Sequence, residues 1–246
     1  MYFTRLISIL MVLFIFSEIH GQVLSLQYRA VPGEHIEDFV HRETTYWSQV
    51  AQKAIDNKQM IAWELWERVG GWDLDDNSSN FVFVNVFEDV KALDNLSEMW
   101  GAIPEVLPNM RMSDMETNSL SKVTASLYLN GVAGFGNGGN YAVVNYSLAD
   151  DTDNFIEFET KSWLPFITSA MNSGKTSVKG WSAYTLMSPS GTYMPFNVMS
   201  VDQYDKMSDA LSPDFDESLE FPDMTEYSNH LERKYIGIYR LVKRLE

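Results

Sequence analysis

The 246-residue sequence contains no cysteine, which excludes disulfide bonds, thiolate metal ligands and a cysteine nucleophile. Basic residues are also scarce: 18 Lys and Arg stand against 34 Asp and Glu, giving a formal net charge of −16. Such a chain repels phosphate backbones and anionic lipid headgroups, so nucleic acid is not an expected partner. The G-x-S-x-G, H-E-x-x-H and P-loop motifs are missing as well, so the sequence carries none of these catalytic or nucleotide-binding signatures.

Long hydrophobic runs are absent except at the start of the chain, where residues 6–16 are apolar apart from Ser8. A helix that spans a bilayer needs about 20 apolar residues, so this run is too short. Arg5 precedes it, and a polar stretch ending in Gly21 follows it. This order predicts a signal peptide over residues 1–21, cleaved before Gln22. We therefore expect a periplasmic or secreted protein that is free of the membrane after cleavage.

The clearest pattern in the rest of the chain is an internal repeat. A Glu-Thr-x-x-Trp motif starts at Glu43 and again at Glu159, inside two helical patterns of similar length. Two further features recur in the same order and at nearly the same spacing, which makes three matches in all. The proposed pairs are Trp47 with Trp163, Trp63 with Trp181, and Asn85 (in Phe83-Val84-Asn85-Val86) with Asn197 (in Pro195-Phe196-Asn197-Val198). One structural unit used twice is the simplest cause of this order.

Each copy shows a β-α-β-β-α-β pattern of hydrophobic periodicity. We expect a first repeat over residues 22–130, a glycine-rich linker over 131–139, and a second repeat over 140–246. The predicted strands are 23–31, 61–69, 80–87 and 122–129, then 141–146, 177–187, 192–199 and 235–245. The predicted helices are 34–55 and a broken 90–115, then 153–172, with a kink at Pro165, and a broken 201–230. The glycines of the linker lead into a strand, whereas those of a dinucleotide-binding loop open a helix.

A unit of this pattern forms a four-stranded antiparallel sheet with two helices on one face. The strand at 80–87 is apolar on both sides, so the second face must also be covered, and the other repeat is the available cover. The predicted fold is α+β, with two ferredoxin-like units packed sheet to sheet as an intramolecular pseudo-dimeric α/β barrel. We expect a monomer with this internal pseudo-dimer or a higher oligomer.

This arrangement resembles the dimeric α/β-barrel superfamily, here as a single-chain tandem version. That superfamily includes antibiotic-biosynthesis-type monooxygenases, haem-degrading oxygenases, EthD-like and NIPSNAP-like proteins, and binding proteins without known chemistry. The resemblance covers the whole mature chain but rests on topology and repeat spacing, without a catalytic motif. It implies a fold that hosts many functions, so activity must be argued from the site.

Two carboxylates are the first candidates for such a site. Glu43 and Glu159 each fall on the apolar face of a predicted helix, four residues before a tryptophan. Burial there should raise the carboxyl pKa and suit a general acid or base, or a group that binds a cationic or hydroxylated ligand. The alternative is a structural glutamate that pairs with an arginine or holds the helix to a strand.

The repeated aromatic and amide residues could complete a pocket between helix and sheet. Strand alternation places Trp63 in phase with Ile61 and Leu65, and Asn85 in phase with Phe83. Together with Trp47 they suit a small, mainly apolar or aromatic ligand, and Trp163, Trp181 and Asn197 would do the same in the second copy. The alternative is an aromatic core with a satisfied amide. Pro165 and the shorter spacing make the second copy the one expected to have closed.

No cofactor is predicted, and no metal site. Haem would need one of His35, His41 or His230, but these are single residues unrelated by the repeat, and no pair has metal-ligand spacing. The leading hypothesis is an exported protein that binds a small apolar or aromatic molecule, with cofactor-independent oxygenase-type chemistry as a further expectation. The alternatives are a non-catalytic module for protein or glycan interaction and a haem-binding member of the superfamily.

Overall fold

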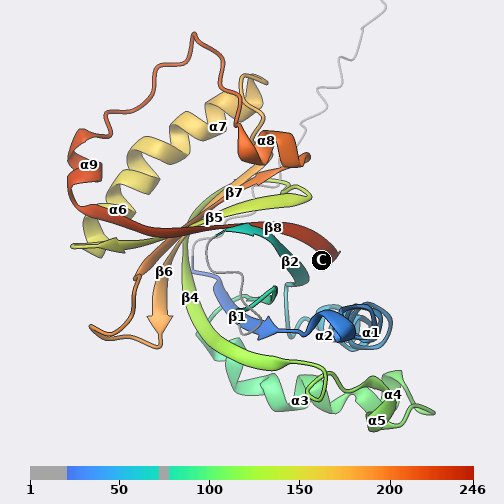
Figure 1. Ribbon diagram of the computed structural model, residues 1–246. Coiled ribbons are helices and arrows are strands. Elements are labelled where there is room, and N and C mark those ends of the chain that lie inside the picture. Colours follow the sequence, from blue (N-terminus) through green and yellow to red (C-terminus); the bar gives the residue numbers. More distant parts are fainter. Residues whose placement is uncertain (1–20, 72–77) are drawn as a thin grey trace, which may run out of the picture.

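The computed structural model describes residues 21–71 and 78–246, so the predicted signal peptide lies, apart from Gly21, outside the described residues. The described strands form a closed antiparallel barrel in the order β1-β3-β2-β8-β5-β7-β6-β4 (Figure 1). The strands of the first half are β1 (Val23–Ala30), β2 (Ala62–Gly71), β3 (Phe81–Phe87) and β4 (Lys122–Gly136). Those of the second half are β5 (Tyr141–Ala149), β6 (Gly180–Ser188), β7 (Val198–Tyr204) and β8 (Leu231–Leu245).

Each half has the strand order of a ferredoxin-like unit, β4-β1-β3-β2 in the first and β8-β5-β7-β6 in the second. The edge strand β2 pairs with β8, and β4 pairs with β6, so the two sheets join at both edges. Closure leaves no sheet edge exposed and turns one face of both sheets toward a common interior. The predicted fold class, a pseudo-dimeric α/β barrel within one chain, is confirmed.

The barrel interior is a packed core. Alternate residues of β1, among them Leu24 and Leu26, point inward and meet residues of the second half. The hydroxyl of Tyr146 lies 2.7 Å from that of Tyr28 and 3.1 Å from that of Tyr239, so the buried phenols satisfy one another. A cavity within this core has a volume of only about 70 Å³. A hollow of about 700 Å³ opens beside Tyr28, Tyr146 and Tyr239, and the outward faces of the strands offer further room.

Helices cover those outward faces on opposite sides of the barrel (Figure 1). Their bounds in the first half are η1 (Gly33–His35), α1 (Ile36–Arg42), η2 (Glu43–Trp47), α2 (Ser48–Asp56), η3 (Val90–Asn95), α3 (Leu96–Gly101), α4 (Ile103–Val106) and α5 (Met112–Met115). In the second half they are α6 (Thr152–Phe158), η4 (Glu159–Trp163), α7 (Leu164–Asn172), α8 (Met207–Leu211) and α9 (Thr225–Asn229).

The Glu-Thr-x-x-Trp motif forms the same unusual structure in both halves. Glu43–Trp47 and Glu159–Trp163 are each a π-helical turn inserted between two α-helical segments. Such wider turns are rare and occur frequently at functional sites. In both halves the glutamate that begins the turn is buried. Pro165 falls in the first turn of α7, where a proline is tolerated, so it follows the wide turn without ending the helix.

Three predicted boundaries were wrong. β4 continues to Gly136 and pairs with β6 as far as Gly180, so most of the expected linker 131–139 is strand. β7 begins at Val198, because residues 189–197 form a proline-containing loop where a strand over 192–199 was expected. The predicted broken helix over 201–230 is the end of β7 followed by the short helices α8 and α9.

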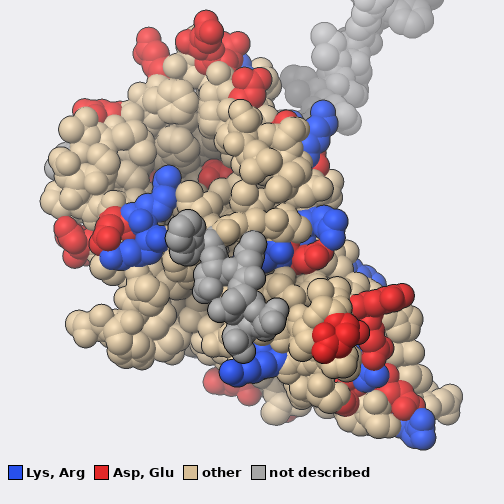
Figure 2. Space-filling view, in the orientation of Figure 1, with Lys and Arg blue, Asp and Glu red and all other residues tan. Residues whose placement is uncertain are grey.

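Charge is spread over the surface. Figure 2 shows Asp and Glu side chains along the top of the molecule and again over the helices at the lower right, with groups of Lys and Arg side chains between them. In the part of the chain that the structure describes, no helix combines the length and the apolar composition needed to cross a membrane.

Candidate functional site

A pocket of about 640 Å³ lies between the helices of the first half and the outward face of its sheet. Four predicted site residues, Glu43, Trp47, Trp63 and Asn85, line it together. They come from η2, β2 and β3, and the segment of residues 112–118 forms a further wall. The aromatic ring of Trp100 from α3 also lines this space. The sequence therefore identified the correct place for a pocket in the first half.

Glu43 lies in the polar part of this pocket and is only 5% exposed. The Thr117 hydroxyl donates a hydrogen bond to Oε1 of Glu43 over 2.6 Å. Burial raises the pKa of Glu43 to about 7, while the hydrogen bond from Thr117 and the charge of Arg29 act in the opposite direction. A carboxyl group with this pKa is populated in both forms near neutral pH and can give or take a proton.

Arg29 is a pocket residue that sequence reasoning missed. It lies on β1, in phase with the outward-facing Ser25 and Gln27, and is 9% exposed. Its guanidinium donates to Gln27 Oε1 over 2.8 Å and, farther along the chain, to Asn118 Oδ1 over 2.9 Å and Ser121 Oγ over 3.0 Å. The phase of three polar residues on one side of an otherwise apolar strand was the signal that could have found it.

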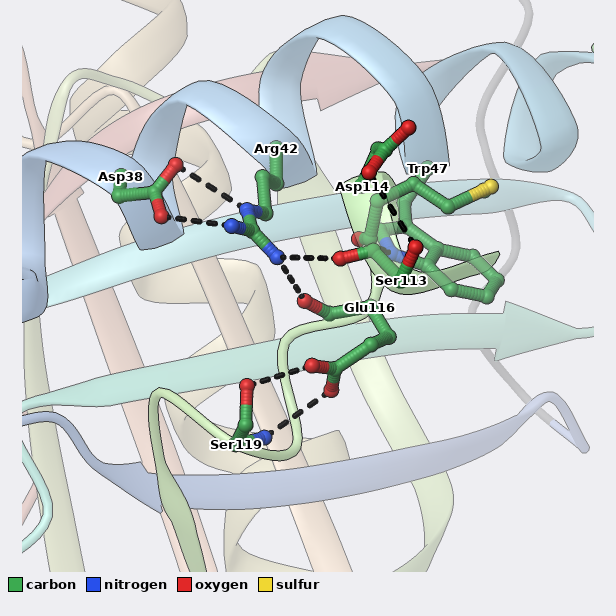
Figure 3. A network of polar contacts seen from close by, with 8 residues as sticks. Asp38, Arg42, Trp47, Ser113, Asp114, Glu116 and Ser119 are labelled. Atoms are coloured by element: carbon green, nitrogen blue, oxygen red, sulfur yellow. Dashed lines mark hydrogen bonds and ion pairs between the residues drawn. The ribbon is translucent and has the colours of Figure 1, made fainter. Parts of the chain in front are cut away.

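Hydrogen bonds from the first helix fix the segment that forms the pocket wall (Figure 3). The Trp47 indole N–H donates to the carbonyl oxygen of Met115 over 2.8 Å. Arg42 donates to the carbonyl oxygen of Glu116 over 2.7 Å while its other nitrogens pair with Asp38 (Figure 3). The Trp47 N–H is thus already hydrogen-bonded within the protein, so only the apolar surface of the Trp47 ring is free to contact a ligand.

The sheet side of the pocket combines aromatic rings with polar side chains, among them the amide of Asn85. Trp63 is 2% exposed, and its ring lies 6.0 Å from that of Phe83, between ring centroids. The amide nitrogen of Asn85 lies 3.4 Å from the carbonyl oxygen of Ser25. Oδ1 of Asn85 is buried and has no hydrogen-bond partner among the described residues. A buried acceptor without a donor is costly to the folded state.

The corresponding space in the second half is filled by protein side chains. Glu159 is 4% exposed, and the Tyr227 hydroxyl donates to its Oε1 over 2.7 Å. The Tyr227 ring also stacks on Phe158, with 4.0 Å between ring centroids. Burial raises the pKa of Glu159 to about 8, the Tyr227 hydrogen bond lowers it, and the charge of Asp202 adds to the rise. The two glutamates thus share a position, but Glu159 faces a tyrosine instead of an open pocket.

The other predicted residues of the second half belong to its core. Trp181 is 3% exposed, and the Trp163 ring packs on Phe166 with 5.2 Å between centroids. Asn197 bridges to the backbone of Ala149, accepting from its N–H over 2.7 Å and donating to its carbonyl oxygen over 2.8 Å. Asn197 therefore has a structural role, and the prediction that it lines a ligand pocket was wrong.

The pairing of Asn85 with Asn197 was wrong. Asn80 makes the same two backbone hydrogen bonds in the first half, to Val31, that Asn197 makes in the second. The strand register gives the true counterpart: Trp63 lies opposite Asn85, and Trp181 lies opposite Asp202. Asn80 therefore corresponds to Asn197, and Asn85 to Asp202, whose pKa burial raises to about 6. The tryptophan pair Trp63 and Trp181 occupies equivalent positions.

Neither a metal nor a haem ligand set is present in the pocket. Within residues 21–71 and 78–246, no three His, Asp or Glu side chains are placed to hold a metal ion. None of the histidines in the described part of the chain lines the pocket. Nδ1 of His41 faces the Thr45 hydroxyl at 3.3 Å on the outside of the helix, and His230 lies beside α9, 3.9 Å from Asp150. The residues of this pocket therefore do not fit a haem held by a histidine.

No protein-family model and no curated protein matches this chain. Its likeness to solved structures is one of fold. A "putative monooxygenase" from Lactobacillus acidophilus NCFM has a TM-score of 0.54 at 10% identity, over 92% of this chain and 96% of that one. A second "putative monooxygenase", from Fusobacterium nucleatum, has a TM-score of 0.52 at 12% identity, over 92% of this chain and 94% of that one.

A "putative chlorite dismutase" has a TM-score of 0.50 at 11% identity, over 92% of this chain and 96% of that one. These matches extend over nearly the whole of both chains, so they concern the complete barrel and not one half of it. They show that this chain shares its fold, a closed barrel built from two four-stranded sheets with helices on the outside, with those proteins. At such low identity they carry no residue role across, and the chemistry must come from the pocket itself.

Proposed function

We propose that this protein binds a small, mainly apolar or aromatic molecule in the pocket of the first half, with Glu43 as its proton-exchanging group. The observation that carries the proposal is the contrast between the halves. Glu43 faces an open volume of about 640 Å³, whereas Glu159 in the same position faces the Tyr227 hydroxyl. A carboxyl group at 5% exposure is expensive to bury without a use, and the aromatic walls suit a planar ligand.

Oxygenase-type chemistry without a cofactor is the reaction that we propose for this pocket. Glu43 in its ionised form would take a proton from an acidic O–H or C–H of the bound molecule, which leaves an electron-rich anion able to react with dioxygen. A base with a pKa near 7 is half ionised at neutral pH, as such proton transfer requires. Two structures of the same fold are named as monooxygenases, and this supports the class of chemistry without identifying a substrate.

A non-catalytic module for protein or glycan interaction is the alternative, and it predicts a filled space around Glu43. The open pocket around this carboxyl favours the small-molecule hypothesis instead. Export through a signal peptide and the descent of both halves from one duplicated unit are part of the same proposal. The shared strand order and the two π-helical turns support the duplication.

Native mass spectrometry of protein purified from its own host tests the binding function. We expect a retained small molecule on the wild type and its loss from Ser126→Trp, because Ser126 is an exposed residue that lines the pocket and a tryptophan there would fill it. Ile236→Trp is the matched control, because Ile236 lies opposite Asn145 on β8 as Ser126 lies opposite Gln27 on β4. Equal retention by both variants would refute the proposed site.

A further inference from the structure

The π-helical turn that contains Glu43 is held by a lysine from the other half of the molecule. Lys243 lies on β8, and its Nζ donates to the carbonyl oxygen of Thr44 over 2.7 Å and to Oγ of Ser48 over 2.9 Å. The Ser48 hydroxyl donates to the same Thr44 oxygen over 2.7 Å. Two side-chain donors therefore meet on one carbonyl oxygen of the turn, in the residue directly after Glu43.

These contacts support the turn from outside the ligand space. Glu43 and Trp47 of the turn line the pocket, whereas Thr44, Ser48 and Lys243 do not. A wide turn shifts the backbone hydrogen bonds of a helix by one residue, and here the Ser48 N–H bonds to the carbonyl oxygen of Glu43. Side-chain donors to the next carbonyl oxygen, that of Thr44, fix the turn in this altered bonding pattern.

A β-bulge in β8 aims Lys243 at the helix. Lys243 lies opposite Leu65 of β2, and the next pair in this ladder involves Leu241. Val242 is therefore an extra residue, and bulges of this kind re-aim the side chains beside them. Lys243 shares the outward face with Leu65, which packs in the core beneath the first-half helices. The end of β8 lies beside β2, on the side of α1 and α2 (Figure 1).

The second half has the same bulge but neither donor. Its strand β4 has an extra residue at Val132, and Ala133 stands next to it, at the position that corresponds to Lys243. Leu164 follows the second Glu-Thr-x-x-Trp motif directly, at the position that corresponds to Ser48. Alanine and leucine side chains have no hydrogen-bond donor, so neither can tie a carbonyl oxygen of the second turn. The clamp is thus confined to the half with the open pocket.

We infer that Lys243 is a positioning residue of the proposed site, because its bond to the Thr44 carbonyl oxygen holds the turn that presents Glu43 to the pocket. The inference rests on the proposed function, since it assigns a role within the same site. Lys243 belongs to the last strand of the second half, so the first half does not complete its own site. The second half contributes this strand to the site in place of a second pocket.

A double-mutant cycle at positions 43 and 243 of the full mature chain tests this role. The Tm is measured at about pH 5 and about pH 8 for wild type, Glu43→Gln, Lys243→Met and the double variant. Methionine keeps an apolar stem and removes the donors of lysine. Arg29 and Thr117, which also act on the Glu43 carboxyl group, are the same in all four proteins.

Glu43→Gln should raise the Tm of the otherwise unchanged chain at about pH 8, because the Glu43 carboxylate is buried. In the Lys243→Met background the turn should loosen and admit water to this carboxylate. We therefore expect the gain in Tm from Glu43→Gln to fall by about half. Lys243→Arg keeps a donor and should keep most of the gain. Ser48→Ala removes the other donor to the same oxygen and should reduce the gain, which preserves the test if Lys243→Met does not fold.

Lys234→Met is the matched control, because Lys234 lies on the same strand and pairs with Glu232 of that strand. It should leave the gain from Glu43→Gln unchanged. A lysine that serves only stability would lower the Tm equally with and without Glu43→Gln, so an unchanged gain in Lys243→Met would overturn the inference. A larger gain would overturn it too, since loss of a distant positive charge alone would raise the pKa of Glu43.

Ligand retention in native mass spectrometry is a second readout. The retained molecule should be lost from Lys243→Met and recovered in Lys243→Arg. A wild type that retains no molecule would contradict the proposed function, while the cycle would still decide whether Lys243 positions Glu43. A wild type that retains its molecule without any coupling in the cycle would contradict the positioning role alone.

Discussion

Replacing Glu43 with glutamine should stabilise the protein at neutral and alkaline pH. Burial raises the pKa of Glu43 from 4.5 to about 7, so the folded state favours the protonated carboxyl group. A raised carboxyl pKa contributes its full stability below pH 4.5, and this contribution is lost as the pH rises to about 7. A shift of this size corresponds to about 3 kcal/mol of the free energy of unfolding. Glutamine has no such loss, and its Oε1 can still accept the hydrogen bond from Thr117.

The assay is thermal and urea unfolding of wild type and Glu43→Gln between pH 4.5 and pH 8.5. The two proteins should be equally stable near pH 4.5 and diverge as the pH rises. At pH 8 the free energy of unfolding of the variant should be higher by about 3 kcal/mol, or its Tm higher by roughly 6 to 12 °C for a chain of this size. Other buried acids titrate in both proteins, so the difference between the two curves isolates Glu43. Glu37→Gln, an exposed change on the same helix, should shift stability by less than about 0.5 kcal/mol.

If Glu43 has only a structural role, Glu43→Gln should be less stable than wild type. If its carboxylate neutralised Arg29 directly, its loss would leave a buried cation without a partner and cost about 3 to 5 kcal/mol. A variant that melts well below wild type at pH 8, with unchanged uptake of the retained molecule, would refute the assignment of Glu43 as a functional group. A stabilised variant with reduced uptake is the expected outcome.

Three further predictions follow from the same contacts. Glu159→Gln should raise the free energy of unfolding by roughly 5 kcal/mol at pH 9, since the pKa of Glu159 is raised from 4.5 to about 8. The same variant should leave ligand retention unchanged, and reduced retention would mean that the second half also binds. Asn80→Ala and Asn197→Ala should each lower the free energy of unfolding by about 2 kcal/mol in urea titrations, because each loses two backbone hydrogen bonds; a large loss for one alone would contradict their equivalence. Trp47→Phe should cost about 1 kcal/mol and weaken ligand retention, because the pocket wall loses its tie to the helix; unchanged retention would show that the wall is held by other contacts.

The sequence by itself predicted the architecture and four residues that line the candidate pocket. Hydrophobic periodicity is a local property, so it predicted two β-α-β-β-α-β units, and the doubly apolar β3 predicted a cover on each face of the sheet. The Glu-Thr-x-x-Trp motif identified both helices that contain a buried glutamate, and Glu43, Trp47, Trp63 and Asn85 do meet in one pocket. Their phase on a helix or strand was enough to place them on one side of the sheet, because the π-helical turn in the first helix leaves Glu43 on its buried face.

The sequence predicted the second copy as the closed one, and Glu159 is indeed covered by Tyr227. Only the tertiary structure showed which side chain covers it and which residues complete the pocket of the first half. Tyr227 lies in the short helix α9 and Thr117 in a loop, each far along the chain from the glutamate to which it donates. No local pattern could therefore show that one fills a space and the other lines one. The match of Asn85 with Asn197 failed because residue similarity in a short run does not fix strand register, which depends on hydrogen bonds to neighbouring strands. Arg29 became significant only when burial removed its water and left it facing neutral partners, and that desolvation is a property of the assembled barrel and not of the sequence around it.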